Sequence, residues 1–163
     1  MASRRAPSLR FLVAHPAHFI ALGFGAGLSP VAPGTVGTLL AVPLALLIRS
    51  LTGDLGYLLI VLAAFGVGVW AAGRTGRALG VADHPSIVWD EVVAFLLVLL
   101  VVGTEPMRMF LAFVLFRFFD IVKLPPASTI DREWHHGLGV MADDIVAAFY
   151  ALVVFAVGQR VLA

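Results

Sequence analysis

The chain has 163 residues, of which 61% are hydrophobic and 13% are charged, with a mean hydropathy of +1.01. Soluble domains carry about 25% charged residues, so this composition excludes an ordinary soluble enzyme and indicates a membrane protein. The formal net charge of +1 argues against nucleic acid as a partner, and the absence of cysteine excludes disulfides, thiolate zinc sites and cysteine nucleophiles.

The first apolar stretch, residues 11–28, follows three arginines, Arg4, Arg5 and Arg10. A cleaved signal peptide has a continuous apolar core and a cleavage site of small residues, whereas two histidines and a proline interrupt this stretch. We therefore expect the segment to belong to the mature protein, as a cytoplasmic lead-in that lies in the membrane interface or re-enters the bilayer.

The clearest membrane span is residues 55–73, which contain no charged residue and carry Tyr57 and Trp70 near their ends, where amphipathic rings prefer to lie. The other apolar runs are residues 34–48, 92–104, 107–119 and 145–158. Because a spanning helix needs about 20 residues, these shorter runs must extend into their polar flanks. We expect an all-α, multi-pass membrane bundle with about four to five spans, a broken or re-entrant N-terminal segment, and a single domain over residues 1–163.

When the short apolar runs are extended into their polar flanks, pairs of charged residues fall in the end turns of the helices. The pairs are Asp90 with Glu91 in a first turn, Asp120 with Lys123 in a last turn, and Asp143 with Asp144 in the first turn of the final helix. The charges are then expected at or just below the membrane surface.

The orientation follows from Lys and Arg near the span ends, which concentrate on the cytoplasmic side. With the N-terminus inside, eight lie on the inner side and three, Arg49, Arg108 and Arg160, lie on the outer side. The inner residues are Arg4, Arg5, Arg10, Arg74, Arg77, Arg117, Lys123 and Arg132. The same topology places eight of the ten carboxylates on the inner side. These are Asp83, Asp90, Glu91, Asp120, Asp131, Glu133, Asp143 and Asp144.

Residues 27–38 contain two prolines and three glycines, which break a helix. Irregular backbone at membrane depth is tolerated only where it is buried in protein or lines a cavity. Ser29, Thr35 and Thr38 supply hydroxyl groups, and a helix that starts near Gly34 presents free N–H groups that suit a phosphate. The alternative is an ordinary turn and helix cap. The segment is not a P-loop, because no Gly-Lys-Ser/Thr follows.

Two acidic pairs, Asp90-Glu91 and Asp143-Asp144, open apolar helices. One acid at a helix start can simply complement the helix dipole, yet ionisable groups at membrane depth are costly and are candidates for function. A Gly-x-Gly segment, which we expect to be flexible, precedes the second pair. His135 and His136 lie just before this segment. Three roles are open for them: ligands, a proton shuttle, or ordinary interfacial histidines.

Arg117, Asp120 and Lys123 are spaced at i, i+3 and i+6, so on a helix they form one polar stripe. One interpretation is an internal salt bridge with snorkelling cations at a helix end. The other is a carboxylate metal ligand flanked by two cations that bind phosphate.

Together, the three acidic helix ends form a site rich in the oxygen ligands that Mg²⁺ prefers, in combination with substrate phosphate oxygens. The candidate metal ligands are Asp90, Glu91, Asp120, Asp143 and Asp144, and these five with Lys123 are the candidate catalytic residues. The candidates for substrate binding are Ser29, Thr35, Thr38, Arg117 and Lys123. The pattern predicts metal-dependent chemistry on a phosphate carried by a lipid and approached from the cytoplasm.

At this point four ordered motifs of the chain resemble the bacterial phosphatidylglycerophosphatase A family. They are Gly-Leu-Ser-Pro-x-Ala-Pro-Gly-Thr-x-Gly-Thr at 27–38, Ile-Val-x-Asp-Glu-Val-Val at 87–93, Phe-Arg-x-Phe-Asp-Ile-x-Lys at 116–123 and Gly-x-Gly-Val-Met-x-Asp-Asp at 137–144. The resemblance implies magnesium-dependent removal of the terminal phosphate from phosphatidylglycerophosphate, which gives phosphatidylglycerol, at the cytoplasmic face of the inner membrane. The implied partners are this lipid substrate and membrane lipids.

The resemblance carries over Asp90, Glu91, Asp120, Lys123, Asp143 and Asp144 as functional residues, with Asp131 as a secondary one. The chain also departs from the family. Leu124-Pro125-Pro126 stands where Pro-x-Pro is usual, Trp134-His135-His136 stands where a Gly-rich approach is common, and Ala94 and Ala148 replace expected glycines. These departures bear on loop geometry and substrate preference.

Two alternatives to a phosphatase belong to other classes. A small ion-coupled transporter uses buried carboxylates as a cation path, but such a path needs ionisable groups near the membrane midplane. A structural membrane subunit has no catalytic need for the acids. Within the phosphatase reading, direct attack by water and attack by an aspartate through a phospho-aspartyl intermediate both stay open.

Overall fold

Among residues 7–162, which the computed structural model describes, every regular element is helical, so the predicted all-α class is confirmed. Arg4 and Arg5 lie outside the described residues. The elements are α1 (Leu9–Val13), α2 (Pro16–Ala21), the 3₁₀ segment η1 (Gly23–Leu28), α3 (Pro33–Leu51), α4 (Asp54–Leu79), α5 (Trp89–Val102), α6 (Pro106–Val122), α7 (Ala127–Glu133) and α8 (Gly137–Leu162).

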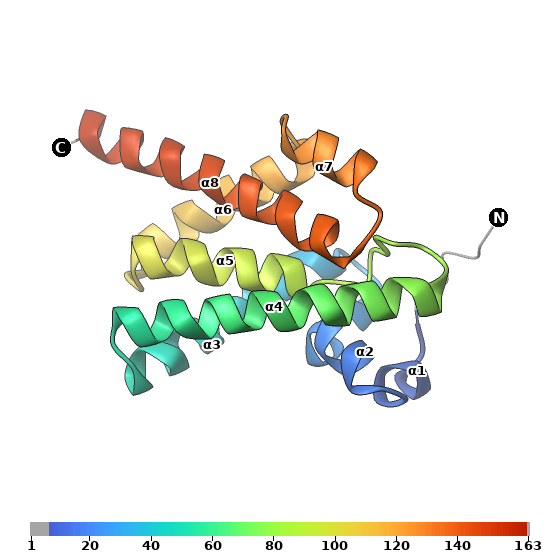
Figure 1. Ribbon diagram of the computed structural model, residues 1–163. Helices are drawn as coiled ribbons and strands as arrows, with labels where there is room; N and C mark the ends of the chain where they lie inside the picture. Colours follow the sequence, from blue (N-terminus) through green and yellow to red (C-terminus); the bar gives the residue numbers. More distant parts are fainter. Residues whose placement is uncertain (1–6, 163) are drawn as a thin grey trace.

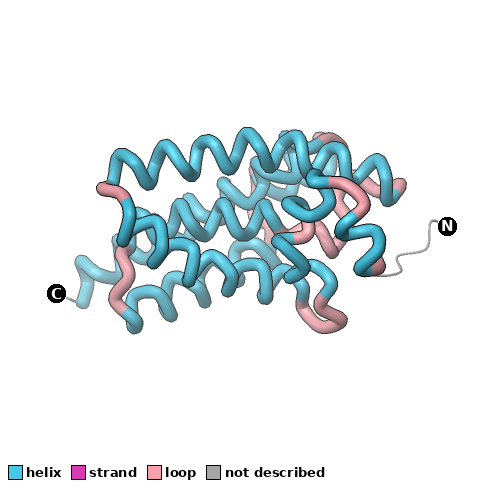
Figure 2. The backbone as a smooth tube through the Cα atoms, turned by 90° about the horizontal axis from the view of Figure 1, so that it is seen from below, coloured by secondary structure: helices cyan, strands magenta, loops and turns pink. Residues whose placement is uncertain are grey.

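The five long helices, α3 to α6 and α8, form a bundle whose short elements gather at one end (Figure 1). The helices α1, α2 and α7 lie at that end, and the C-terminus of α8 lies at the other. A second view shows the loops joining the helices near their ends (Figure 2). The N-terminal segment is broken as predicted, because Phe24 and Gly25 inside η1 adopt positive φ angles of 57° and 113°.

Helix α5 is the centre of the bundle and packs against α3, α4, α6 and α8. Ten of its 14 residues are buried, as expected for a helix that is hydrophobic on all sides. The Tyr57 hydroxyl on α4 donates to the Leu96 carbonyl at 3.1 Å, and the Trp89 indole donates to the Ala64 carbonyl at 3.0 Å. These two bonds fix α5 against α4 and hold the first turn of α5 in place.

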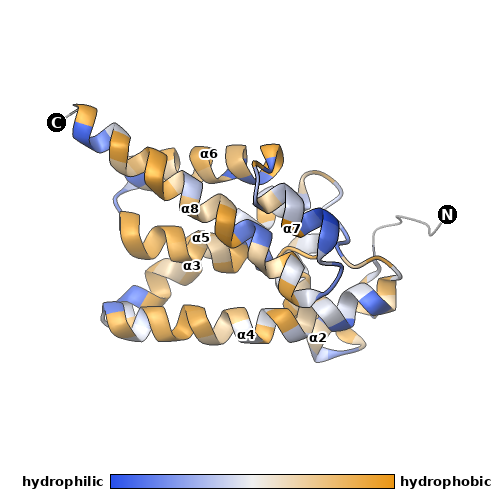
Figure 3. Cartoon of the chain, turned by 45° about the horizontal axis from the view of Figure 1, so that its top comes forward, coloured by the Kyte–Doolittle hydropathy of each residue, from blue (hydrophilic) through white to orange (hydrophobic). Residues whose placement is uncertain are grey.

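The outside of the bundle is apolar along the long helices, whereas hydrophilic residues concentrate around α7 and at helix ends (Figure 3). Three helices are long and apolar enough to cross a membrane, at Pro33–Leu51, Asp54–Leu79 and Gly137–Val161. They support a multi-pass membrane protein. Helices α5 and α6 have 14 and 17 residues, or about 21 and 26 Å at 1.5 Å per residue, so the higher span count stays a prediction.

The turns at the end of the bundle away from α7 hold the two remaining acids, Asp54 and Glu105. Arg49 forms an ion pair with Asp54 at 3.2 Å and donates to the Leu99 and Leu100 carbonyls at 3.2 and 2.7 Å. The Glu105 carboxylate accepts from two backbone N–H groups of the first turn of α6, which lowers its pKa. Both acids are therefore structural groups at this end.

The start of α8 differs from the prediction. The helix begins at Gly137, so Asp143 and Asp144 lie in its second turn and not in its first, and the Gly-x-Gly segment forms part of the helix. The reason is close packing. A Cβ atom on Gly137 would overlap the Val69 carbonyl of α4, and one on Gly139 would overlap the Trp134 carbonyl. Only glycine lets the start of α8 lie so close to its neighbours.

We expect Gly137→Ala to destabilise the protein by about 1–3 kcal/mol, since overpacking forces backbone shifts of that cost. The matched control is Gly66→Ala on α4, where an added Cβ meets nothing within 4 Å and the higher helix propensity of alanine should be neutral or favourable. Unfolding in a denaturing detergent measures the stability of both variants. Equal stability of the two variants would contradict the packing at Gly137.

Candidate active site

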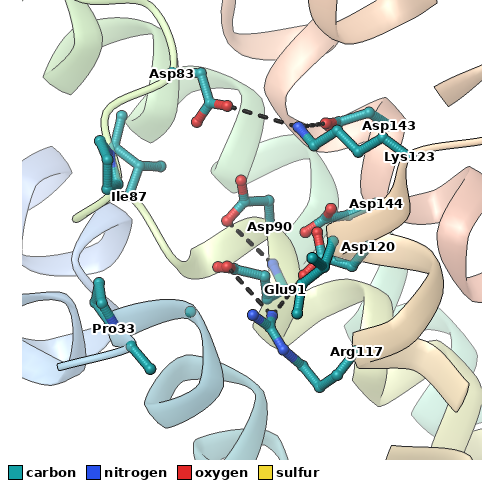
Figure 4. A pocket seen from close by; sticks show the side chains of 14 residues that line it. Pro33, Asp83, Ile87, Asp90, Glu91, Arg117, Asp120, Lys123, Asp143 and Asp144 are labelled. Atoms are coloured by element: carbon teal, nitrogen blue, oxygen red, sulfur yellow. Dashed lines mark hydrogen bonds and ion pairs between the residues drawn. The ribbon is translucent and has the colours of Figure 1, made fainter. Parts of the chain in front are cut away.

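A cavity of about 320 Å³ lies at the end of the bundle that carries α7. Its walls come from the start of α3, the loop before α5, the first turn of α5, the end of α6 and the second turn of α8. Figure 4 shows its charged side chains pointing toward one another from these separate elements. They are Asp83, Asp90, Glu91, Arg117, Asp120, Lys123, Asp143 and Asp144.

Three acids of the cavity, Asp90, Glu91 and Asp144, form an acidic trio. Each offers a carboxylate oxygen, and these oxygens lie within 4.8 Å of one another. Oε2 of Glu91 and Oδ2 of Asp144 are buried and have no hydrogen-bond partner among the described residues. Buried charges are normally paired or bound to a metal. Orphaned, converging carboxylate oxygens are therefore what a divalent cation site requires.

Arg117 faces the acidic trio from α6. Its Nη1 atom lies 2.6 Å from Oδ2 of Asp120 and 3.6 Å from Oε1 of Glu91. The same atom donates to the Thr38 hydroxyl on α3 at 3.3 Å, and that hydroxyl donates to the Gly34 carbonyl at 2.9 Å. Thr38 is completely buried, and its hydroxyl holds the Arg117 guanidinium against α3.

Lys123 organises a second acidic group at the cavity mouth. Its Nζ atom lies 2.7 Å from Asp131 and from Asp143, and 3.9 Å from Asp83. Burial alone would lower the pKa of Lys123, but the three carboxylates outweigh burial and raise it. For Asp83, burial raises the pKa, which the nearby Asp131 supports and the Lys123 charge opposes. Lys123 therefore stays protonated at neutral pH.

The formal charges of the cavity and its mouth do not balance. Two cations, Arg117 and Lys123, stand among seven carboxylates. The carboxylates are Asp83, Asp90, Glu91, Asp120, Asp131, Asp143 and Asp144. Four of them, Asp90, Asp120, Asp143 and Asp144, are at least nine-tenths buried. Such a surplus of negative charge needs added positive charge or protons before an anionic phosphate can enter.

The structure brings all six predicted catalytic residues into one cavity, and Asp131 joins them through Lys123. Of the two interpretations of the α6 stripe, the internal salt bridge is present, because Arg117 pairs with Asp120 beside the cavity, and the metal-ligand interpretation stays a prediction. Lys123, however, leaves the helix with a positive φ of 47° and turns toward α7 and α8. Sequence reasoning gave Asp83 no site role, since a single loop acid between helices carries no helical spacing.

The predicted hydroxyl groups of residues 27–38 do not line the cavity. The Ser29 hydroxyl donates to the Val31 carbonyl at 2.8 Å within its own turn, and Thr35 is absent from the cavity wall. Thr38 reaches the site only through Arg117. The backbone of Ala32, Pro33 and Gly34 lines the cavity instead, with Ala32 at a positive φ of 45°.

Thr38→Val should lower catalytic turnover by roughly 10-fold, the lower end of the range for groups that orient a functional side chain. Valine has nearly the same shape but leaves Arg117 without its partner on α3. Thr38→Ser keeps the hydroxyl and should retain most of the turnover. If the valine and serine variants behave alike in a steady-state assay, the hydroxyl does not orient Arg117.

The chain is similar to proteins of a known family. The family model described as Phosphatidylglycerophosphatase A matches residues 19–159. Phosphatidylglycerophosphatase A of Escherichia coli (strain K12) is 42% identical over 139 residues, which cover 85% of this chain and 80% of that protein. The Haemophilus influenzae protein of the same name is 40% identical over 153 residues, covering 93% of this chain and 94% of the relative. No solved structure matches the chain significantly.

Proposed function

The chain belongs to the phosphatidylglycerophosphatase A family, and we propose that it hydrolyses phosphatidylglycerophosphate to phosphatidylglycerol and inorganic phosphate with the help of Mg²⁺. The proposed location is the inner membrane of a bacterium, with the site at the cytoplasmic face. The observation that carries the proposal is the convergence of buried, unpaired carboxylate oxygens next to Arg117 in a cavity at one end of an apolar bundle.

The acidic trio fits a magnesium ion by its donor chemistry, since Mg²⁺ takes oxygen ligands and usually keeps waters while it binds one or two carboxylates and substrate phosphate. Asp90, Glu91 and Asp144 would hold the ion, with Asp120 and Asp143 beside them. A bound Mg²⁺ supplies charge neutralisation and polarisation of a phosphate oxygen. The orphaned oxygens of Glu91 and Asp144 support this assignment.

The chain's own residues complete the reaction by holding the phosphate. Arg117 lines the cavity between the acidic trio and α3, so its guanidinium is placed to donate to phosphate oxygens. Lys123 adds a fixed positive charge at the mouth. Hydrolysis forms a bond from a water oxygen to phosphorus and breaks the bond from phosphorus to the glycerol oxygen, which leaves with a proton. Direct attack and a phospho-aspartyl route give these same products.

The cytoplasmic placement rests on the distribution of basic residues. The cavity end carries Arg10, Arg74, Arg77, Arg117, Lys123 and Arg132, and the opposite end carries Arg49, Arg108 and Arg160. The ion-coupled transporter has less support. Eight of the ten acids gather at the cavity end, and the centre of α5 between the two ends is packed with apolar side chains such as Phe95 and Leu99. Among the described residues of α5, no ionisable side chain lies beyond Glu91, whereas a transport path needs such groups near the midplane.

The proposed substrate is tested by the lipid products of the purified protein in detergent and magnesium, offered phosphatidylglycerophosphate or phosphatidic acid in separate reactions. We expect conversion of the first lipid to phosphatidylglycerol and little change of the second. Equal turnover of both lipids would show a general lipid phosphate monoesterase. Turnover of neither lipid would reject the phosphatase proposal and make ion flux in sealed vesicles the next test.

A further inference from the structure

A second cavity of about 300 Å³ lies where the C-terminal end of α4 and its following loop meet the start of α8. We call it the basic cavity, because the only titratable side chains in its lining are Arg77, His135 and His136. Among the described residues that line it, none carries a carboxylate. Its volume is at the lower end of the range for small-molecule sites.

The basic side chains are available for a ligand. The Arg77 guanidinium and the His135 ring make no hydrogen bond or ion pair with the described residues, and both side chains are exposed. In His136, Nδ1 accepts the Gly139 N–H at 3.4 Å, which leaves Nε2 as the donor nitrogen of the ring. Three donors therefore surround a space whose other walls are mostly glycine and small apolar residues.

The acids nearest in sequence are directed elsewhere. Asp83 follows Ala82 of the basic cavity, but its carboxylate points to Lys123 in the first cavity (Figure 4). Glu133 is exposed and lies 3.9 Å from Arg132. The basic cavity and the carboxylate cavity are thus two separate sites of opposite charge at the same end of the bundle.

Two exposed apolar side chains lie close to the histidines in the sequence. Trp134 and Leu138, 43% and 40% exposed, flank the histidines, and tryptophan favours the boundary between lipid and water. Arg77 continues the helix that carries the apolar stretch of α4. We therefore expect the basic cavity to open near the level of the lipid head groups.

We propose that the basic cavity binds a phosphate-bearing anion through Arg77, His135 and His136, independently of the carboxylate cavity. Guanidinium and imidazole donors recognise phosphate oxygens through charge-assisted hydrogen bonds. The shared chemistry is a phosphate group, carried by an anionic lipid head group such as phosphoglycerol or present as the free ion. This assigns a role to the Trp134-His135-His136 segment, which the proposed phosphatase reaction does not use.

The test is titration calorimetry of the purified protein in neutral detergent with a chelator, so that no divalent cation assists binding at the carboxylate cavity. The probes are inorganic phosphate, short-chain phosphatidylglycerol and short-chain phosphatidylcholine. We expect one or both anions to bind. The substitutions Arg77→Gln and His135→Gln should each raise the Kd by about 10-fold or more. Binding of phosphatidylglycerol alone identifies a lipid head group, and binding of both anions identifies the phosphate group itself.

Arg132→Gln is the matched control, because Arg132 is an exposed arginine at the same end of the bundle but outside the cavity lining. It should change Kd by less than about 2-fold, as expected for an exposed charge. Equal weakening in the Arg77 and Arg132 variants would show diffuse surface attraction and overturn the proposal. Equal affinity for phosphatidylcholine, or no binding of either anion, would also overturn it. Far-UV circular dichroism verifies that each variant is folded.

Discussion

Asp144→Asn is expected to lower phosphate release from phosphatidylglycerophosphate by at least about 100-fold, because it removes a charged ligand from a site built to hold a cation. Asp144 is 4% exposed and its Oδ2 atom is buried without a described partner. Asparagine keeps the shape of the side chain, so folding should change little, while the acidic trio loses one of its three charges.

The control for this substitution is Asp54→Asn at the opposite end of the bundle. Asp54 pairs with Arg49, but its side chain is 83% exposed, and exposed ion pairs contribute little to stability. Its activity should stay within about 2-fold of the parent. The steady-state rate of phosphate release, measured at several magnesium concentrations, compares the two. Wild-type activity in Asp144→Asn would remove the acidic trio from the mechanism.

Gly34→Ala should reduce kcat/KM by roughly 100-fold, the effect of displacing a reacting group by about 1 Å. A Cβ atom at Gly34 would overlap Oε1 of Glu91 and lie 3.3 Å from Nη1 of Arg117. The substitution changes no charge and removes no ligand. It therefore tests whether the position of Glu91 and Arg117, and not only their presence, determines the activity.

Gly158→Ala on α8 is the matched control, since a Cβ atom there meets nothing within 4 Å and the substitution should leave kcat/KM unchanged. The two variants receive the same added methyl group on a helix. Full activity in Gly34→Ala would show that the start of α3 does not constrain the catalytic side chains, and the close approach of α3 to α5 would then have no functional meaning.

Five acids of the site could be predicted because they sit at the ends of apolar runs, namely Asp90, Glu91, Asp120, Asp143 and Asp144. A charge pair such as Asp90-Glu91 must lie near the membrane surface, and the positive-inside rule places the helix ends of α5, α6 and α8 on one side. Ends that share a side of a small bundle lie close together, and the cavity that gathers these residues follows.

The positions that sequence could not supply depend on contacts between distant segments. The start of α8 at Gly137 is set by its approach to Val69, and composition alone reads Gly-x-Gly as a flexible link. Asp83 enters the site because Lys123 leaves α6 and turns toward it. The hydroxyl of Ser29 donates to the Val31 carbonyl within its own turn, since serine side chains in turns often bond to neighbouring backbone groups.

The most direct test of the central claim is phosphate release from phosphatidylglycerophosphate by the purified wild-type protein, first in excess EDTA and then after Mg²⁺ is added back beyond the chelator. We predict no release above background in EDTA and recovery of activity on addition of Mg²⁺, since the acidic trio needs a divalent cation before it can accept a phosphate. Undiminished release in EDTA would contradict the assignment of the acidic trio as a metal site.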